Sequence, residues 1–246
     1  MIEDRLEIER EGARVEALLL RPDEFVEFPG VLFYTDIWGI RPANIAMARR
    51  LAQKGFTVLM PNVFFRYGPL RENGFEPADD GERKKVLGAL FQAETSAQMQ
   101  SDGAAYADFL GHCKGVRKGK LGVVGYCFTG AMAVHTAAAA PDRIAAAASF
   151  HGGMLVTDAS ESPHLQFPRI AARLYFGHAV EDKSMTGAQI ETLERALRDW
   201  HGAFQSETYE GALHGWTVPG RDVYNELQAD RAFQTLVELF DATLKT

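Results

Sequence analysis

The stretch that most constrains the fold is a buried strand that runs straight into an alanine-rich helix. Residues 121–124 read Leu-Gly-Val-Val, a short apolar run typical of a buried parallel strand. Residues 131–140 are rich in alanine, the strongest helix former. Only the segment Gly125-Tyr-Cys-Phe-Thr-Gly130 is left to make the turn between them. A strand and a helix joined around a nucleophilic side chain predict an α/β sheet with a reactive group at its carboxyl edge.

Cys127 is the nucleophile that this turn predicts. Such a turn holds its central residue at positive φ, so that the side chain projects above the sheet and the residues two positions away must be small. Gly125 meets this requirement, whereas Thr129 stands where glycine is usual and Gly130 follows one position later. The helix N-terminus after Cys127 favours negative charge on a thiolate or an oxyanion. The alternative is an unreactive cysteine buried in the core.

The Gly-Tyr-Cys-x-x-Gly elbow resembles that of the dienelactone hydrolases in the α/β-hydrolase superfamily. The resemblance implies a mostly parallel central sheet with helices on both faces and no large lid. It also implies that an acid and then a histidine follow the nucleophile along the chain.

Alternating strand and helix patterns favour a single α/β domain over residues 1–246. An antiparallel hairpin is expected at the sheet edge over residues 6–19, and residues 61–81 read as a long irregular stretch. Apolar runs predict further strands at residues 31–34, 56–60, 144–150, 172–176 and 205–209. Helices are expected at residues 42–52, at 82–112 with a break near Glu94 or Gly103, and at 131–140, 186–201 and 223–244.

His214 and Asp182 follow the nucleophile in the expected order. His214 comes directly after a predicted strand, and the glycine beside it permits the ring to move between nucleophile and leaving group. Asp182 lies in the preceding loop, where a carboxylate can orient the imidazole. Glu181 is the alternative acid; Asp182 is preferred because the Gly-x-x-x-x-Asp-x-Ser run resembles the acid loop of the family. The non-catalytic alternatives are a surface histidine and solvated carboxylates.

The oxyanion hole is expected to combine the backbone amides of Phe128 and Ile37. Ile37 lies in a loop after the strand at residues 31–34, at the same edge of the sheet as the elbow. His151-Gly-Gly is similar to the oxyanion motif of lipases, but that motif precedes the nucleophile and this one follows it. His151 is expected to line the pocket instead.

Asp36 is expected to modulate the thiol, because the family resemblance implies a carboxylate, usually glutamate, beside the cysteine. A carboxylate there disfavours the thiolate by like-charge repulsion until substrate rearranges the site. Aspartate is one methylene shorter than glutamate, so the sequence leaves open whether the Asp36 carboxylate contacts Cys127. The alternative is a loop or helix-capping aspartate.

The resemblance also implies small lactone substrates that carry a carboxylate, and therefore a cation near the elbow. Arg83 and Arg221 are the preferred cations over Arg66 and the neighbouring Lys84 and Lys85. Trp38 and Trp216 lie in the loops that flank the site and are expected substrate contacts.

Charge and composition narrow the class of protein. The net charge of −7 without a basic run disfavours nucleic acid as a partner. The two cysteines give no disulfide framework, and no histidine pair has zinc-ligand spacing, so no metal or cofactor is expected. No segment has the pattern of a signal peptide or a membrane span, so a cytoplasmic location without membrane contact is expected. The oligomeric state is not predicted.

The combined expectation is a metal-free hydrolase of small lactones or esters that works through an acyl-enzyme on Cys127. One alternative is a general carboxylesterase or thioesterase with the same triad, because function depends on the pocket rather than on the fold. Another is a non-catalytic binding or redox-sensing protein in which Cys127 is a reactive thiol.

Overall fold

The chain is organised around one eight-stranded sheet with the strand order β1-β2-β4-β3-β5-β6-β7-β8. The computed structural model describes residues 1–23, 25–75, 77, 79–93 and 95–245. The strands are β1 (Ile2–Arg10), β2 (Ala13–Arg21), β3 (Gly30–Tyr34), β4 (Thr57–Pro61), β5 (Leu121–Tyr126), β6 (Ile144–Phe150), β7 (Arg173–Glu181) and β8 (Phe204–Leu213). β1 and β2 form the expected antiparallel edge hairpin, and β2 also pairs antiparallel with β4. The six strands β4, β3, β5, β6, β7 and β8 run parallel to one another.

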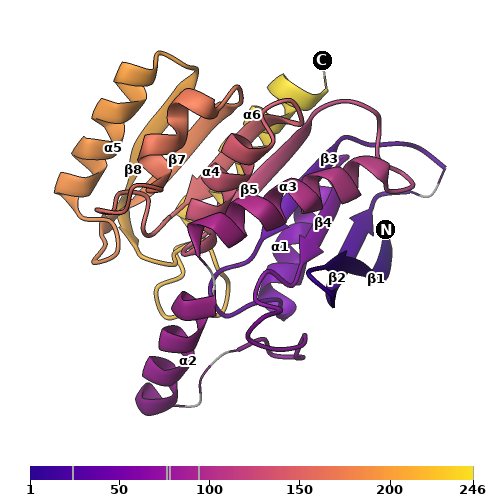
Figure 1. Ribbon diagram of the computed structural model, residues 1–246, viewed down its shortest axis with the longest axis horizontal. Coiled ribbons are helices and arrows are strands. Elements are labelled where there is room, and N and C mark those ends of the chain that lie inside the picture. The colour runs from indigo at the N-terminus through magenta and orange to yellow at the C-terminus, as the bar shows by residue number, and fades with distance from the viewer. Residues whose placement is uncertain (24, 76, 78, 94, 246) are drawn as a thin grey trace.

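Helices cover both faces of this sheet (Figure 1). They are α1 (Pro42–Ala52), α2 (Asp80–Ala93), α3 (Ser96–His112), α4 (Thr129–Ala139), α5 (Gly187–Trp200) and α6 (Glu226–Leu244), with a short 3-10 helix, η1 (Pro163–Arg169). One apolar core joins the sheet to α3, α4 and α5, and a second joins its other face to α1 and α6. The expected α/β architecture is therefore confirmed. Within the described ranges, no helix has the length and apolar content needed to cross a membrane.

The long helical pattern after residue 82 is divided into two helices. α2 ends at Ala93 and α3 begins at Ser96, where the Thr95 hydroxyl and the Gln98 side chain form a reciprocal cap. Glu94, one of the two expected break points, lies outside the described residues. Gly103, the other, lies inside α3, where an added Cβ would come within 2.1 Å of the Thr136 hydroxyl. This glycine therefore permits close packing of α3 on α4 rather than a break.

The elbow after β5 is shaped by a steric limit. A Cβ added to Gly125 would lie 2.1 Å from the carbonyl oxygen of Thr129, and one added to Gly130 would lie 2.8 Å from Gly152 Cα. These approaches close the turn around Cys127, which has a φ of 59°. The positive φ expected for a nucleophile elbow is thus present.

Thr129 occupies the position where glycine is usual, and its hydroxyl holds the turn together. Thr129 Oγ1 accepts a hydrogen bond from the Tyr126 amide at 3.0 Å and lies 2.7 Å from the carbonyl oxygen of Thr35, to which it donates. Thr35 directly follows β3. The departure from glycine is therefore accommodated because the side chain ties the elbow to the end of the neighbouring strand.

We expect Thr129→Val to lower the free energy of unfolding by about 1–3 kcal/mol, because the buried Tyr126 amide loses its acceptor. Thr129→Ser keeps the hydroxyl and is expected to recover most of this loss. Urea denaturation is the measurement, with Thr192→Val as the matched control, because that hydroxyl bonds only an exposed helix carbonyl. Equal costs for Thr129→Val and Thr192→Val would contradict the role of the hydroxyl.

Candidate active site

Three strand ends bring Cys127, Asp182 and His214 together at the carboxyl edge of the sheet. Cys127 comes directly after β5, Asp182 after β7 and His214 after β8. β7 and β8 extend beyond the ranges expected for them, so that both the acid and the histidine follow a strand end at once. Because these strands run parallel, residues far apart in the sequence meet at one edge.

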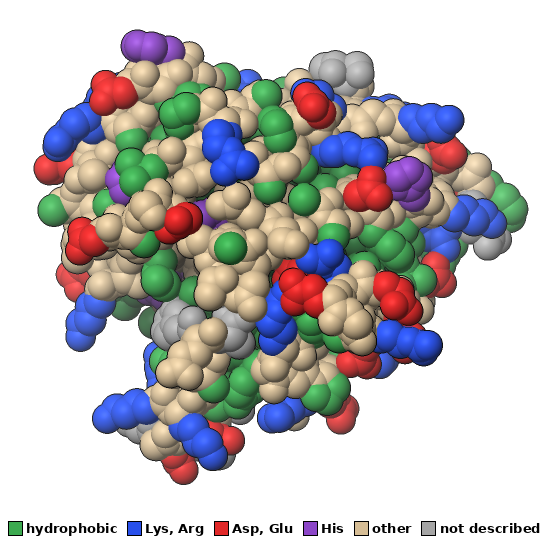
Figure 2. Space-filling model, in the orientation of Figure 1, with side chains coloured by type: hydrophobic (Ala, Val, Ile, Leu, Met, Phe, Trp, Pro, Cys, Tyr) green, Lys and Arg blue, Asp and Glu red, His purple; other side chains and the backbone are tan. Residues whose placement is uncertain are grey.

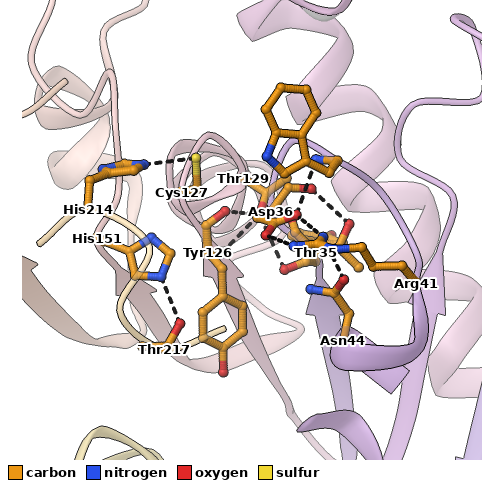
Figure 3. Close-up of polar contacts among 12 residues, drawn as sticks. Thr35, Asp36, Arg41, Asn44, Tyr126, Cys127, Thr129, His151, His214 and Thr217 are labelled. Carbon is orange, nitrogen blue, oxygen red and sulfur yellow. Dashed lines mark hydrogen bonds and ion pairs between the residues drawn. The ribbon is translucent and has the colours of Figure 1, made fainter. Parts of the chain in front are cut away.

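The three side chains form a continuous hydrogen-bonded chain. His214 Nε2 lies 3.0 Å from Cys127 Sγ, and His214 Nδ1 lies 2.6 Å from Asp182 Oδ2 (Figure 3 draws the first of these). Glu181, the alternative acid, is exposed at the end of β7. A histidine held between a carboxylate and a thiol is the arrangement that nucleophilic catalysis requires.

Ser184 supports the acid and was not among the expected site residues. Its backbone amide and hydroxyl donate to Asp182 Oδ1 at 2.7 and 2.6 Å, and its hydroxyl lies 3.2 Å from His214 Nδ1. These bonds occupy the carboxylate oxygen that His214 does not use. The Asp-x-Ser spacing was the available signal, because an aspartate side chain in a loop commonly accepts a hydrogen bond from the backbone amide two residues on.

The electrostatics favour a charged histidine. Partial burial by itself would lower the pKa of His214, but the hydrogen bonds to Asp182 and Cys127 and the negative charges beside it raise the pKa to about 10. Burial likewise would raise the pKa of Asp182, but the hydrogen bonds from His214 and Ser184 lower it below its ordinary value. Because the pKa of His214 is raised on folding, its bound proton stabilises the fold fully below the unfolded pKa of 6.5, and this contribution is lost as the pH rises through about 10.

A cavity of about 720 Å³ opens onto the thiol. Phe128 and Ile37, the expected oxyanion donors, both line it together with Cys127 and His214. Two of the expected substrate contacts, Arg83 from α2 and Arg221 from the loop after His214, also line it, as does Trp38. The Arg83 guanidinium lies 5.7 Å from the centre of the Trp38 ring, within the range of a cation–π contact.

The expectation for Trp216 is wrong, because this side chain is fully buried. It packs 5.0 Å from the His151 ring and 5.0 Å from the Tyr209 ring, behind the cavity wall. Its place two residues after His214 made it a candidate, but its burial was not visible in the sequence. It supports the wall of the site rather than the substrate.

Arg66, Lys84 and Lys85, the less favoured cations, do not line this cavity. The Arg66 side chain instead forms ion pairs with Asp102 and Glu11. Lys84 and Lys85 are exposed on α2, the lobe at the lower left of Figure 2, where basic and acidic side chains lie side by side.

Asp36 lies at the cavity wall, but its hydrogen bonds run to its own loop. Its carboxylate accepts two hydrogen bonds from Arg41, at 2.5 and 2.7 Å, and one from the Trp38 amide at 3.1 Å (Figure 3). The positive charge of Arg41 offsets the repulsion that an unpaired carboxylate would exert on a thiolate. The thiol-modulating role remains a prediction, and Arg41 is a neighbour that the sequence pattern did not identify.

His151 lines the cavity as expected, and its ring also packs against that of His214. It is buried at the end of β6, its Nε2 lies 2.7 Å from Thr217 Oγ1, and its ring centre lies 5.2 Å from that of His214. Burial and the nearby charge of His214 hold the pKa of His151 well below its ordinary value, so it is neutral. Among the described residues, no group of three His, Cys, Asp or Glu side chains is arranged to hold a metal ion.

We expect the pKa of His214 to fall from about 10 by at least ~1 unit in Cys127→Ala, because a hydrogen bond and a negative charge that raise it are removed. NMR titration of the imidazole protons measures this. Cys113→Ala is the control, since Cys113 lies at the end of α3 and not in the cavity. An unchanged midpoint in Cys127→Ala would show that thiol and imidazole are not coupled.

Comparison with known proteins places this arrangement in one family. Residues 15–244 match the dienelactone hydrolase family. A protein of Synechocystis sp. described as "Putative carboxymethylenebutenolidase" is 27% identical over 241 residues, which is 97% of this chain and 96% of that protein. The carboxymethylenebutenolidase of Pseudomonas sp. strain P51 is 32% identical over 112 residues, covering 45% of this chain and 44% of the relative.

A solved structure with the same family description shares this fold. A Klebsiella pneumoniae crystal structure described as a "Putative Dienelactone Hydrolase" superimposes with a TM-score of 0.86 at 23% identity, covering 97% of this chain and 98% of the other. The match to the family extends from the edge hairpin to the last helix and includes Cys127, Asp182 and His214. The chain therefore belongs to the dienelactone hydrolase family and is a hydrolase that acts on esters or lactones.

Proposed function

We propose that the protein hydrolyses small lactones or esters of the dienelactone type through a Cys127-His214-Asp182 triad and an acyl-enzyme. The observation that carries this proposal is the continuous contact from Asp182 Oδ2 through His214 to Cys127 Sγ, at 2.6 and 3.0 Å. A positively charged His214 stabilises negative charge on the sulfur, which is the nucleophilic form of a thiol. A cytoplasmic location remains part of the same prediction.

Acylation begins when Cys127 Sγ attacks the carbonyl carbon of the substrate. The π electrons move to the carbonyl oxygen, and the Phe128 and Ile37 amides supply hydrogen bonds to this oxyanion. Collapse of the tetrahedral intermediate breaks the bond to the leaving oxygen, which takes the proton from His214 Nε2. In a lactone the leaving oxygen stays attached to the acyl chain, so ring opening leaves a hydroxyacyl thioester on Cys127.

Deacylation repeats these steps with water. His214, now neutral, takes a proton from the attacking water, and the oxyanion forms again between the same two amides. The thiolate leaves as the carbon–sulfur bond breaks, and the protonated His214 stabilises it. Asp182 remains charged throughout and holds the imidazole in one tautomer through Nδ1.

The substrate is proposed to carry a carboxylate. Arg83 and Arg221 line the cavity from two different elements, so an anion bound there would sit beside the thiol. The cavity volume of about 720 Å³ suits a small organic molecule. A general carboxylesterase with the same triad would use the cavity without these cations.

We expect Cys127→Ala to abolish hydrolysis of p-nitrophenyl acetate and of lactones, and Cys127→Ser to retain weak activity, because a hydroxyl needs a stronger base than a thiol. Initial rates measured with purified protein test this. Cys113→Ala is the matched control, because burial raises the pKa of that thiol to about 11 and it lies outside the cavity.

Retention of the wild-type rate in Cys127→Ala would contradict the triad. Stoichiometric alkylation of Cys127 by iodoacetamide in a wild-type protein that turns over no ester or lactone would favour the non-catalytic alternative.

We expect Arg83→Met and Arg221→Met to raise KM for a carboxylate-bearing lactone by about tenfold or more, and to leave KM for its neutral methyl ester nearly unchanged. The selective loss follows because only the anion gains from a guanidinium. Lys84→Met is the matched control, since it removes a neighbouring charge on α2 that does not line the cavity. If neither arginine variant distinguishes the two substrates, the general-esterase alternative should replace the dienelactone one.

A further inference from the structure

A tight turn at residues 36–39 carries Ile37 into the cavity. The Gly39 amide donates to the Asp36 carbonyl at 3.1 Å, and Gly39 has a φ of 77°, which closes the turn. The Trp38 amide donates to the Asp36 carboxylate at 3.1 Å. Ile37 lies between these two hydrogen bonds, so the direction of its own amide depends on both.

Arg41 fixes the carboxylate on which this turn depends. Arg41 Nη1 and Nη2 contact the two oxygens of Asp36 at 2.5 and 2.7 Å, and the two side chains are only 5% and 8% exposed. Asn44 Oδ1 accepts a further hydrogen bond from Arg41 Nη1 at 2.9 Å. A buried two-point ion pair has one favourable geometry, so the carboxylate cannot rotate away from the Trp38 amide without exposing an unpaired buried charge.

The same turn is tied to the elbow. Thr129, two residues after Cys127, donates to the carbonyl of Thr35, the residue before Asp36. Figure 3 draws the contact of Arg41 with Asp36 and labels Thr35, Thr129 and Cys127 in the same view. The segments that bear Ile37 and Phe128 are therefore held to one another by buried side-chain contacts.

From these contacts we infer that Arg41 is a positioning residue for the oxyanion hole and acts through Asp36 on the amide of Ile37. The inference rests on the proposed function, because it assigns the oxyanion to Ile37 and Phe128. Arg41 itself does not line the cavity. Oxyanion donors act on charge that develops in the transition state, so their displacement lowers kcat more than it weakens substrate binding.

The test compares two reactions of the same sulfur. Hydrolysis of p-nitrophenyl acetate passes through an oxyanion, whereas iodoacetamide alkylation displaces iodide from a saturated carbon and forms no oxyanion. Arg41→Met is expected to lower kcat for the ester by about 10–100-fold, with KM within about threefold of wild type. The alkylation rate of Cys127 is expected to fall by a clearly smaller factor, because it responds only to the charge of the Asp36 carboxylate left without Arg41. A trifluoromethyl ketone, which adds the thiol to give an oxyanion, is expected to bind more weakly by the same factor as kcat/KM falls.

A second variant tests the route through Asp36. Asp36→Asn combined with Arg41→Met leaves a neutral side chain that needs no cation and still offers an oxygen to the Trp38 amide. This double variant is expected to recover most of the kcat lost in Arg41→Met. Arg41→Lys keeps the charge without the two-point geometry, so it should show a smaller loss, and it replaces Arg41→Met if that protein does not fold.

Arg10→Met is the control, because it breaks an ion pair elsewhere in the protein, between Arg10 and Asp102 at 2.8 Å. This variant is expected to leave kcat unchanged. Equal losses of hydrolysis and alkylation in Arg41→Met would overturn the inference, as would an unchanged kcat or no recovery in the double variant. A wild-type protein that is alkylated at Cys127 but hydrolyses no ester would instead overturn the proposed function. In that case the affinity of the trifluoromethyl ketone for wild type and Arg41→Met still tests the inference.

Discussion

The close approach of β5 and α4 at Gly125 is the constraint on which the site depends. No side chain fits between Gly125 and the Thr129 carbonyl, which an added Cβ would approach to 2.1 Å. The backbone therefore turns through a left-handed conformation at Cys127, with a φ of 59°, and the thiol projects from the sheet edge. Asp182 and His214 reach this fixed point from the ends of β7 and β8, since the parallel strands terminate at the same edge.

Two ion pairs beside the thiol have different surroundings and therefore different uses. His214 is 31% exposed and pairs with a nearly buried Asp182, which suits the proton transfers that the proposed mechanism assigns to its ring. Asp36 and Arg41 are both almost fully buried and bound at two points, so this pair has one arrangement and suits a role in holding backbone. The short side chain of Asp36 suits this second role, because its carboxylate accepts a hydrogen bond from the Trp38 amide in its own turn.

The sequence predicted the parts of the site that depend on local chain geometry. Cys127, Asp182 and His214 each follow a strand end, so their meeting could be inferred from the strand patterns together with the chain order that the family resemblance implies. Contacts between distant side chains could not be inferred in this way. Trp216 was expected in the pocket and is buried, Arg66 pairs with Asp102, and Arg41 was not considered. Packing decides these cases, and a single sequence contains no direct record of it.

The division between sheet and loops also explains why family membership leaves the substrate open. The elbow, the acid and the histidine are fixed by strand ends, and in the proposed mechanism they act in the same way on any carbonyl carbon that reaches the thiol. The cations of the cavity come instead from α2 and from the loop after His214, two segments outside the sheet. Loops and added helices vary without disturbing a sheet core, so they set which carbonyl compound is held there. The proposed function therefore assigns substrate choice to Arg83, Arg221 and their neighbours, and assigns the chemistry to the sheet edge.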